Sequence, residues 1–167
     1  LNDNWRLGDT YHFSIGQGPF AITPIQVASA FAAIANGGTL FEPRAVQKVV
    51  DEEKRELYEI PSAVVRSNFV GLENLEVIRE GMRQTVTNGS AAFWLNGLSV
   101  DAAAKTGTAQ TGRYASDGRD YLYSWTVAFA PFDSPEVVMV VIVEDVMIDQ
   151  TVALPIIRDA FQWYFSN

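Results

Sequence analysis

The feature that most constrains the fold is an uninterrupted apolar run at residues 137–143, which follows the turn at residues 131–135. A run without alternating polar residues is typical of a strand that is covered on both faces. The segment before the turn, residues 121–131, is rich in aromatic and β-branched residues and also predicts a strand. Because the turn between them is short, we expect the two strands to pair antiparallel.

Patterns typical of helices lie before and after this pair of strands in the sequence. Thr23 is a capping residue before Pro24, and small apolar residues then recur at helical spacing until 36–38, which suggests close packing. Residues 73–86 and 154–165 each carry one apolar face, and the turn at 87–90 ends the first of these helices. With a further strand at 100–111, the order of elements predicts an α+β domain, mainly an antiparallel sheet flanked by helices.

The remaining segments are predicted to be more irregular. Residues 44–50 and 56–60 flank a charged turn and predict a hairpin. Glycines punctuate residues 1–22, so we expect mainly loop there, with at most one short strand at 12–15. Residues 112–120 are expected to be a polar loop. Arg113, Tyr114, Arg119 and Tyr121 could influence ligand choice there, but a plain surface loop is favoured.

Composition excludes several classes of function. The net charge is −8 and there are only 12 Lys and Arg residues in 167, which argues against a nucleic-acid partner. There are no cysteines and a single histidine, His12, so we expect neither a metal site nor a cofactor. The longest apolar run is far shorter than the roughly 18 residues that span a bilayer. The chain lacks an initial methionine, and we expect a fragment of a longer product.

The candidate chemistry lies in the strand at residues 100–111, where a cation, hydroxyls and a glycine occur together. Lys105 and Gly107 should share one face of the strand, and Thr106 and Thr108 the other. A glycine inside a strand often marks the close approach of another backbone. Taken alone, Lys-Thr-Gly is weak evidence, since a solvated lysine beside a glycine-marked turn is the simpler alternative. Gly16-Gln17-Gly18 is not a nucleotide-binding loop, because no βαβ unit surrounds it.

Several stretches in order nevertheless give the tripeptide a context, and together they cover nearly all of the chain. They are Gly8-Asp9-Thr10, Ile15-Gly16-Gln17-Gly18, Thr23-Pro24-Ile25-Gln26, Ala35-Asn36-Gly37-Gly38, Gly89-Ser90-Ala91, Lys105-Thr106-Gly107-Thr108-Ala109-Gln110 and Phe129-Ala130-Pro131. In these stretches the chain resembles the C-terminal half of the transpeptidase domain of class B penicillin-binding proteins, and is most like the elongation-type enzymes of the penicillin-binding protein 2 kind.

The resemblance implies the fold of serine β-lactamases, a five-stranded antiparallel sheet between helical layers. It implies a serine acyltransferase that acts on the D-Ala-D-Ala end of peptidoglycan stem peptides and is acylated by β-lactams. Lys105 would act as a cation in the catalytic cleft. The hydroxyls of Thr106 and Thr108 would bind the substrate carboxylate, the Thr108 amide would form half of the oxyanion hole, and Gly107 would admit the substrate backbone.

One departure from the family is decisive for the domain prediction. No serine has a lysine three residues further on or an asparagine two residues further on, so the nucleophile and the second motif are absent. We therefore interpret residues 1–167 as the C-terminal portion of the domain, inactive alone and completed by an N-terminal portion with the serine. The alternative is a non-catalytic binding or scaffold module. The resemblance further implies an extracytoplasmic location, with the membrane anchor outside this chain, and partners in a wall-elongation complex.

Overall fold

The computed structural model describes residues 4–18, 21–147 and 151–166. In chain order the elements are α1 (Leu7–Ser14), α2 (Pro24–Ala35), β1 (Thr39–Phe41), β2 (Lys48–Val50), β3 (Glu56–Glu59), β4 (Val64–Ser67), α3 (Leu72–Thr87), α4 (Ala92–Leu95), β5 (Ala103–Tyr114), β6 (Asp120–Ala130), β7 (Val137–Val146) and α5 (Leu154–Ser166). All strand pairs in the described ranges are antiparallel. The predicted α+β class with a mainly antiparallel sheet is confirmed.

The main sheet has the order β5-β6-β7, and its strands match the three predicted at 100–111, at 121–131 and around the apolar run at 137–143. Lys105 lies opposite Val127, which in turn lies opposite Val140. The prediction of a loop at residues 112–120 was wrong in its extent, because β5 continues to Tyr114 through a register shift. Gly112 adopts a φ of +71° at this shift, a conformation that glycine accepts without strain.

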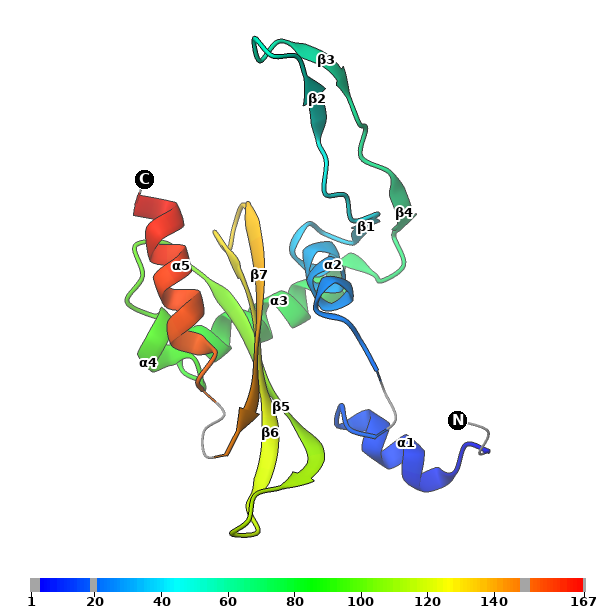
Figure 1. Cartoon of the computed structure of the whole chain (residues 1–167), viewed down its shortest axis with the longest axis vertical. Helices are drawn as coiled ribbons and strands as arrows, with labels where there is room; N and C mark the ends of the chain where they lie inside the picture. The colour runs from blue at the N-terminus through cyan, green and yellow to red at the C-terminus, as the bar shows by residue number, and fades with distance from the viewer. Residues whose placement is uncertain (1–3, 19–20, 148–150, 167) are drawn as a thin grey trace.

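Helices cover both faces of this sheet, as Figure 1 shows, with α2 and α5 on opposite sides of β7. On the α2 face a buried cluster contains Ala35, Met82, Ala103 and Phe129. On the α5 face a second cluster contains residues of α3, α4, α5 and the sheet, among them Val86, Leu95, Ala104, Ala128, Leu154, Ile157 and Phe161. The predicted small-residue packing of α2 is confirmed by Ala33 and Ala35, which are both buried.

The apolar run in β7 lies between these two layers. Val138 packs against the α2 cluster, and its neighbour Met139 packs against the α5 cluster. The prediction that this strand is covered on both faces is therefore confirmed. The strand is nevertheless only half-buried, because β7 is an edge strand of the sheet in the described ranges.

Helix α3 is tied to both layers through Arg79. The guanidinium donates to the carbonyl of Ala35 at the end of α2 and, at 2.6 Å, to the carbonyl of Phe132 after β6. Its carbon atom lies 5.3 Å from the ring centres of both Phe129 and Phe132. One side chain thus joins α2, α3 and the end of β6.

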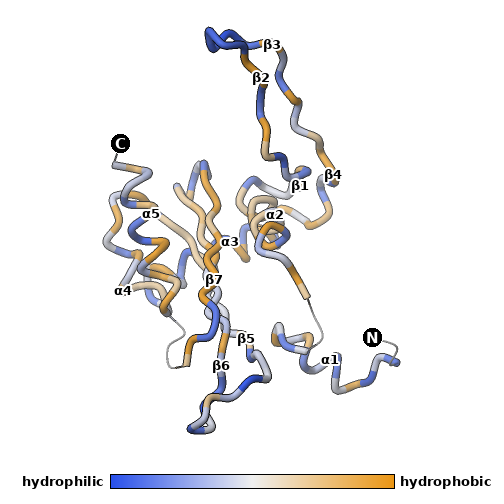
Figure 2. The backbone as a smooth tube through the Cα atoms, in the orientation of Figure 1, coloured by the Kyte–Doolittle hydropathy of each residue, from blue (hydrophilic) through white to orange (hydrophobic). Residues whose placement is uncertain are grey.

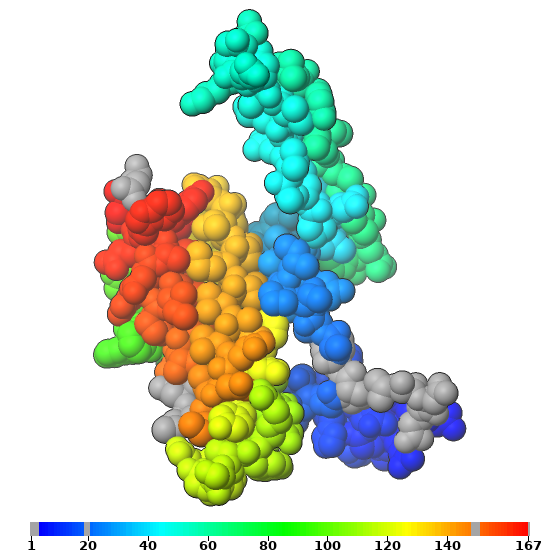
Figure 3. Space-filling model, viewed as in Figure 1, coloured from blue at the N-terminus to red at the C-terminus, as the bar shows by residue number. Residues whose placement is uncertain are grey.

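The predicted hairpin is confirmed as β2 and β3, which form an arm that projects from the body of the molecule in Figures 1 and 3. Figure 2 shows that its tip is hydrophilic, in agreement with the charged turn. The short strands β1 and β4 pair at the base of the arm, with Thr39 opposite Ser67. The sequence did not predict these two strands, because pairing between segments so far apart in the chain leaves little local pattern.

Helix α1 corrects the prediction of a loop with a short strand at 12–15. The backbone N–H of Arg6 donates to the Asp9 carboxylate at 2.8 Å, which caps the helix start. The indole of Trp5 donates to the Thr10 hydroxyl at 2.8 Å. No side chain of α1 is buried, so the helix lacks the buried apolar stripe that would identify it in the sequence. Among the described residues, no helix is both long and apolar enough to cross a membrane.

Candidate active site

Strand β5 holds the four residues that the sequence singles out. Lys105 and Gly107 are exposed, whereas Thr106 and Thr108 are half-buried. Ala103 belongs to the α2 cluster and Ala104 to the α5 cluster, which fixes the alternation of the strand. Lys105 therefore lies on the α2 face and Thr106 on the α5 face.

The outer edge of β5 is defined by the hydrogen bonds of Thr108. Its carbonyl accepts a hydrogen bond from the side-chain amide of Gln17 at 3.1 Å, and so it points away from β6. In an antiparallel strand the N–H and C=O of one residue lie on the same edge, and alternate residues share that edge. The main-chain groups of Thr106 and Thr108 therefore face outward, where no strand of the described ranges pairs with them.

Two side chains lie against Thr106. The Lys105 ammonium donates to the Thr106 carbonyl on this outer edge. The hydroxyl of Ser90, which follows α3, lies 2.9 Å from the Thr106 hydroxyl. A cation and two hydroxyls thus gather at one short length of main chain, a set suited to binding a carboxylate.

Gly107 is not required by the packing of this chain. A methyl group built there meets only the Cβ of Trp125, at 3.8 Å, which is an ordinary contact. Its φ is not in the left-handed region, so backbone conformation does not demand a glycine either. Neither packing nor backbone conformation within this chain therefore explains the glycine, and its lack of a side chain leaves this part of β5 open.

Helix α3 anchors the start of this strand through Arg83. One guanidinium nitrogen donates to the Ala102 carbonyl at 2.9 Å, and another pairs with the Asp101 carboxylate. The Arg83 side chain is 20% exposed but Asp101 is 69% exposed, so the bond to the Ala102 carbonyl is better shielded from water than the ion pair is. This connection holds the end of α3, and with it Ser90, beside Thr106.

The charged residues beyond the site are engaged with one another. Arg113 pairs with Asp145, and its guanidinium carbon lies 5.7 Å from the Tyr121 ring centre. Arg119 pairs with Asp117 at 2.7 Å. The hydrogen bond from Arg119 holds the pKa of Asp117 below its ordinary value, and Asp117 raises the pKa of Arg119 in return. These pairings suit a surface turn, as the sequence favoured.

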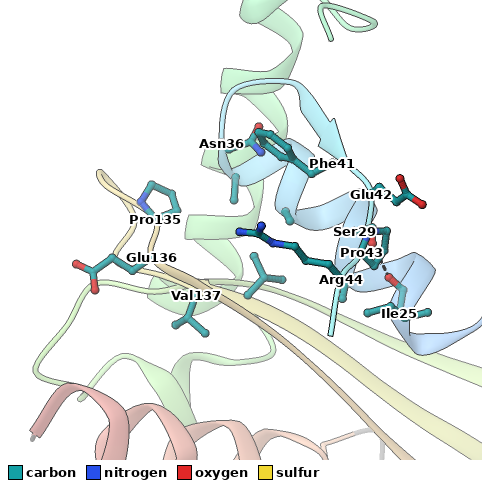
Figure 4. A pocket seen from close by; sticks show the side chains of 14 residues that line it. Ile25, Ser29, Asn36, Phe41, Glu42, Pro43, Arg44, Pro135, Glu136 and Val137 are labelled. Carbon is teal, nitrogen blue, oxygen red and sulfur yellow. Dashed lines mark hydrogen bonds between the residues drawn. The ribbon is translucent and has the colours of Figure 1, made fainter. Parts of the chain in front are cut away.

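Two hollows of the molecule lie away from the candidate site. One of about 440 Å³ lies between α2, residues 41–44 and the β6–β7 turn, and Figure 4 shows Arg44 and Glu136 at it. A second of about 490 Å³, mostly apolar, lies between α2, α3 and the base of the arm. Neither of these two hollows is lined by residues 105–108, which lie on the outer strand of the main sheet. The described residues contain no cluster of potential metal ligands.

The four predicted residues are consecutive on β5, and the structure places against them two residues that the sequence analysis did not assign to the site, Ser90 and Gln17. Ser90 was placed only in a turn that ends a helix, and Gln17 only in a glycine-rich loop. Both belong to stretches on which the family resemblance rests. That resemblance was the one signal in the sequence that could have identified them.

The family model described as the penicillin binding protein transpeptidase domain matches residues 1–162. The chain therefore belongs to this family, and the resemblance to class B penicillin-binding proteins is confirmed.

The similarity of the chain to individual proteins agrees with the family match. The chain is 30% identical to the peptidoglycan D,D-transpeptidase MrdA of Haemophilus influenzae over 98% of its own length and 27% of that protein. The solved structure of penicillin-binding protein 2B from Streptococcus pneumoniae matches with a TM-score of 0.82 and 25% identity, over 98% of this chain and 28% of that one. The complex of penicillin-binding protein PBP2 and MreC from Helicobacter pylori matches with a TM-score of 0.73 and 27% identity, over 99% of this chain and 29% of that one. The chain thus spans about a quarter of the length of these proteins.

Proposed function

We propose that this chain is the C-terminal portion of a peptidoglycan D,D-transpeptidase and supplies one wall of its active site. The observation that carries the proposal is the outer edge of β5, where Lys105, Thr106 and Thr108 surround main-chain groups that no strand of the described ranges pairs with. This edge occurs in a chain that matches the family over residues 1–162.

In the proposed reaction, the groups of that edge bind the substrate. A stem peptide lies along β5 as an added strand, and Gly107 leaves room for its backbone. The Lys105 ammonium and the hydroxyls of Thr106 and Thr108 bind the terminal carboxylate. The Thr108 N–H donates to the carbonyl oxygen as it becomes an oxyanion, a contribution of about 3 kcal/mol to transition-state stabilisation.

The nucleophilic serine lies in an N-terminal portion of the same domain. Its oxygen attacks the penultimate D-Ala carbonyl, the peptide C–N bond breaks, and the departing D-Ala amine takes the serine proton. An amine of a neighbouring peptidoglycan stem peptide then attacks the acyl carbon, the ester C–O bond breaks, and the serine oxygen takes a proton from that amine. Two observations support such a portion. The outer edge of β7 has no partner strand in the described ranges, and α1 exposes apolar residues, namely Leu7, Tyr11 and Phe13.

The same assignment extends to ligands, location and partners. A β-lactam would acylate the same serine as the stem peptide does. The domain would lie on the extracytoplasmic face of the bacterial membrane, held by an anchor outside this chain. The complex of the Helicobacter pylori relative with MreC supports partners among wall-elongation proteins.

The test is labelling of the full-length protein by a fluorescent penicillin. We expect Lys105→Ala to reduce the rate of labelling roughly a hundredfold, since it removes a charge that binds the carboxylate. Lys48→Ala is the matched control, because Lys48 is an exposed lysine on the arm that pairs with Glu56 at 3.4 Å. Equal labelling of wild type and Lys105→Ala would overturn the role of Lys105 in the site. Absence of labelling in both would favour the non-catalytic module, an alternative that no observation of the structure specifically supports.

A further inference from the structure

The loop that contains Gly16, Gln17 and Gly18 lies against the candidate site. The Gln17 side chain donates to the Thr108 carbonyl at 3.1 Å and accepts from the Gln110 N–H at 3.4 Å. The Gln17 side-chain amide thus makes the two hydrogen bonds that a peptide group of a paired strand would make, one to the Thr108 carbonyl and one to the Gln110 N–H on the outer edge of β5.

The loop is built to hold this side chain in place. The Gln17 backbone N–H donates to the His12 carbonyl at 2.9 Å, which joins the loop to the end of α1. Gly16 and Gly18 adopt φ values of +74° and +94°. A Cβ at Gly18 would lie 3.2 Å from the Cβ of His12, so the glycine also permits the close turn.

This contact has a consequence for any extended ligand. When two residues of antiparallel strands form a hydrogen-bonded pair, they exchange both N–H···O=C bonds. A ligand residue whose carbonyl oxygen accepts from the Thr108 N–H therefore directs its own N–H at the Thr108 carbonyl. That carbonyl is the atom to which Gln17 donates.

We propose that Gln17 is a specificity-determining residue, which competes with the acylamino N–H of a ligand for the Thr108 carbonyl and ends the ligand-binding edge of β5 at Thr108. The inference rests on the proposed transpeptidase function. Ligands that carry an acylamino N–H must displace the Gln17 amide, whereas ligands without one leave it in place. Gln17 thus sets how strongly the site distinguishes these two classes of ligand.

The experiment measures acylation of the full-length protein by intact mass with two ligands. Benzylpenicillin carries an acylamino N–H, and penicillanic acid has the same fused rings without that group. In both, the serine oxygen bonds to the lactam carbon, the ring C–N bond breaks, and the ring nitrogen takes the serine proton. The measured quantity is the ratio of the two acylation rates.

Two variants separate the roles of the side chain. Gln17→Ala removes both hydrogen bonds, whereas Gln17→Glu can still accept from the Gln110 N–H but, when ionised, cannot donate to the Thr108 carbonyl. We expect both variants to raise the ratio in favour of benzylpenicillin by about fivefold, the effect of one net hydrogen bond. Gln84→Ala, which alters an amide on α3 that donates to Glu80, should leave the ratio unchanged.

Each outcome bears on the inference. A raised ratio in both variants supports it. A ratio equal to that of wild type, including equal losses with both ligands as expected for a merely structural role, overturns it while leaving the proposed function intact. A wild-type protein that neither ligand acylates overturns the proposed function and this inference with it.

Discussion

The side-chain hydroxyls of Ser90 and Thr106 lie 2.9 Å apart and join the turn after α3 to the centre of the candidate site. Thr106 is half-buried, and its hydroxyl would otherwise rotate freely about its Cβ–Oγ1 bond. Ser90 therefore fixes the orientation of a group that we assign to carboxylate binding. We expect it to act through Thr106, as a positioning residue.

Replacing Ser90 tests this role. We expect Ser90→Ala to slow acylation of the full-length protein by penicillin about fivefold, since one orienting hydrogen bond is lost. Ser90→Thr retains the hydroxyl and should keep most of the rate. Rates from fluorescent penicillin labelling decide between these outcomes, and an equal loss in both variants would show that the hydroxyl pair is unimportant.

Gly107 should tolerate a side chain as far as folding is concerned. The nearest atom to a new Cβ is the Cβ of Trp125 at 3.8 Å, so Gly107→Ala should change the free energy of unfolding by less than about 1 kcal/mol. Acylation by penicillin should nevertheless fall roughly tenfold or more, because the methyl group displaces the ligand backbone. Urea unfolding and labelling of the same preparation measure both effects. Loss of stability and labelling in parallel would contradict this account.

The side-chain hydroxyl of Thr126 is buried and makes no hydrogen bond that would stabilise the described part of the fold. Thr126 is 1% exposed, and its Oγ1 has no hydrogen-bond partner among the described residues. We expect Thr126→Val, which keeps the shape, to raise the free energy of unfolding by about 1 kcal/mol. Thr126→Ala should lower it by about 1 kcal/mol, because it also removes a packed methyl group. Destabilisation by valine would mean that the hydroxyl has a partner in the complete protein.

Arg79 should be important for stability. Its guanidinium donates to the carbonyls of Ala35 and Phe132 and lies over two phenyl rings. We expect Arg79→Ala to lower the free energy of unfolding by about 3 kcal/mol, since it leaves two part-buried carbonyls without this donor. Arg66→Ala is a suitable control, because Arg66 lies on the exposed strand β4, 5.6 Å from the ring centre of Phe69. Similar losses in the two variants would contradict the special role of Arg79.

The parts of the fold that the sequence predicted are those with strong local patterns. The apolar run in β7, the capped start of α2 at Thr23 and the amphipathic faces of α3 and α5 each lie within one continuous segment. The main sheet joins three consecutive strands, so its pairing also followed from short connections. Here local propensity and tertiary structure agree.

The parts that were missed are those without a strong local pattern in the sequence. Helix α1 has no buried face, and β1 pairs with β4 across the whole hairpin arm. The contact of Ser90 with Thr106 spans 16 residues and that of Gln17 with Thr108 spans 91. No periodicity within a segment encodes such contacts. The strand that carries Lys105 was predictable, but the residues that close around it were not.

The position of the nucleophile is tested by the intact mass of the full-length protein after treatment with penicillin, followed by proteolysis and mapping of the acylated residue. We predict the added mass of one penicillin, carried by a serine N-terminal to the segment described here, and no adduct on any serine of residues 1–167. This result would place the nucleophile in the other portion of the domain. An adduct on a serine within residues 1–167, or no adduct at all, would contradict the account.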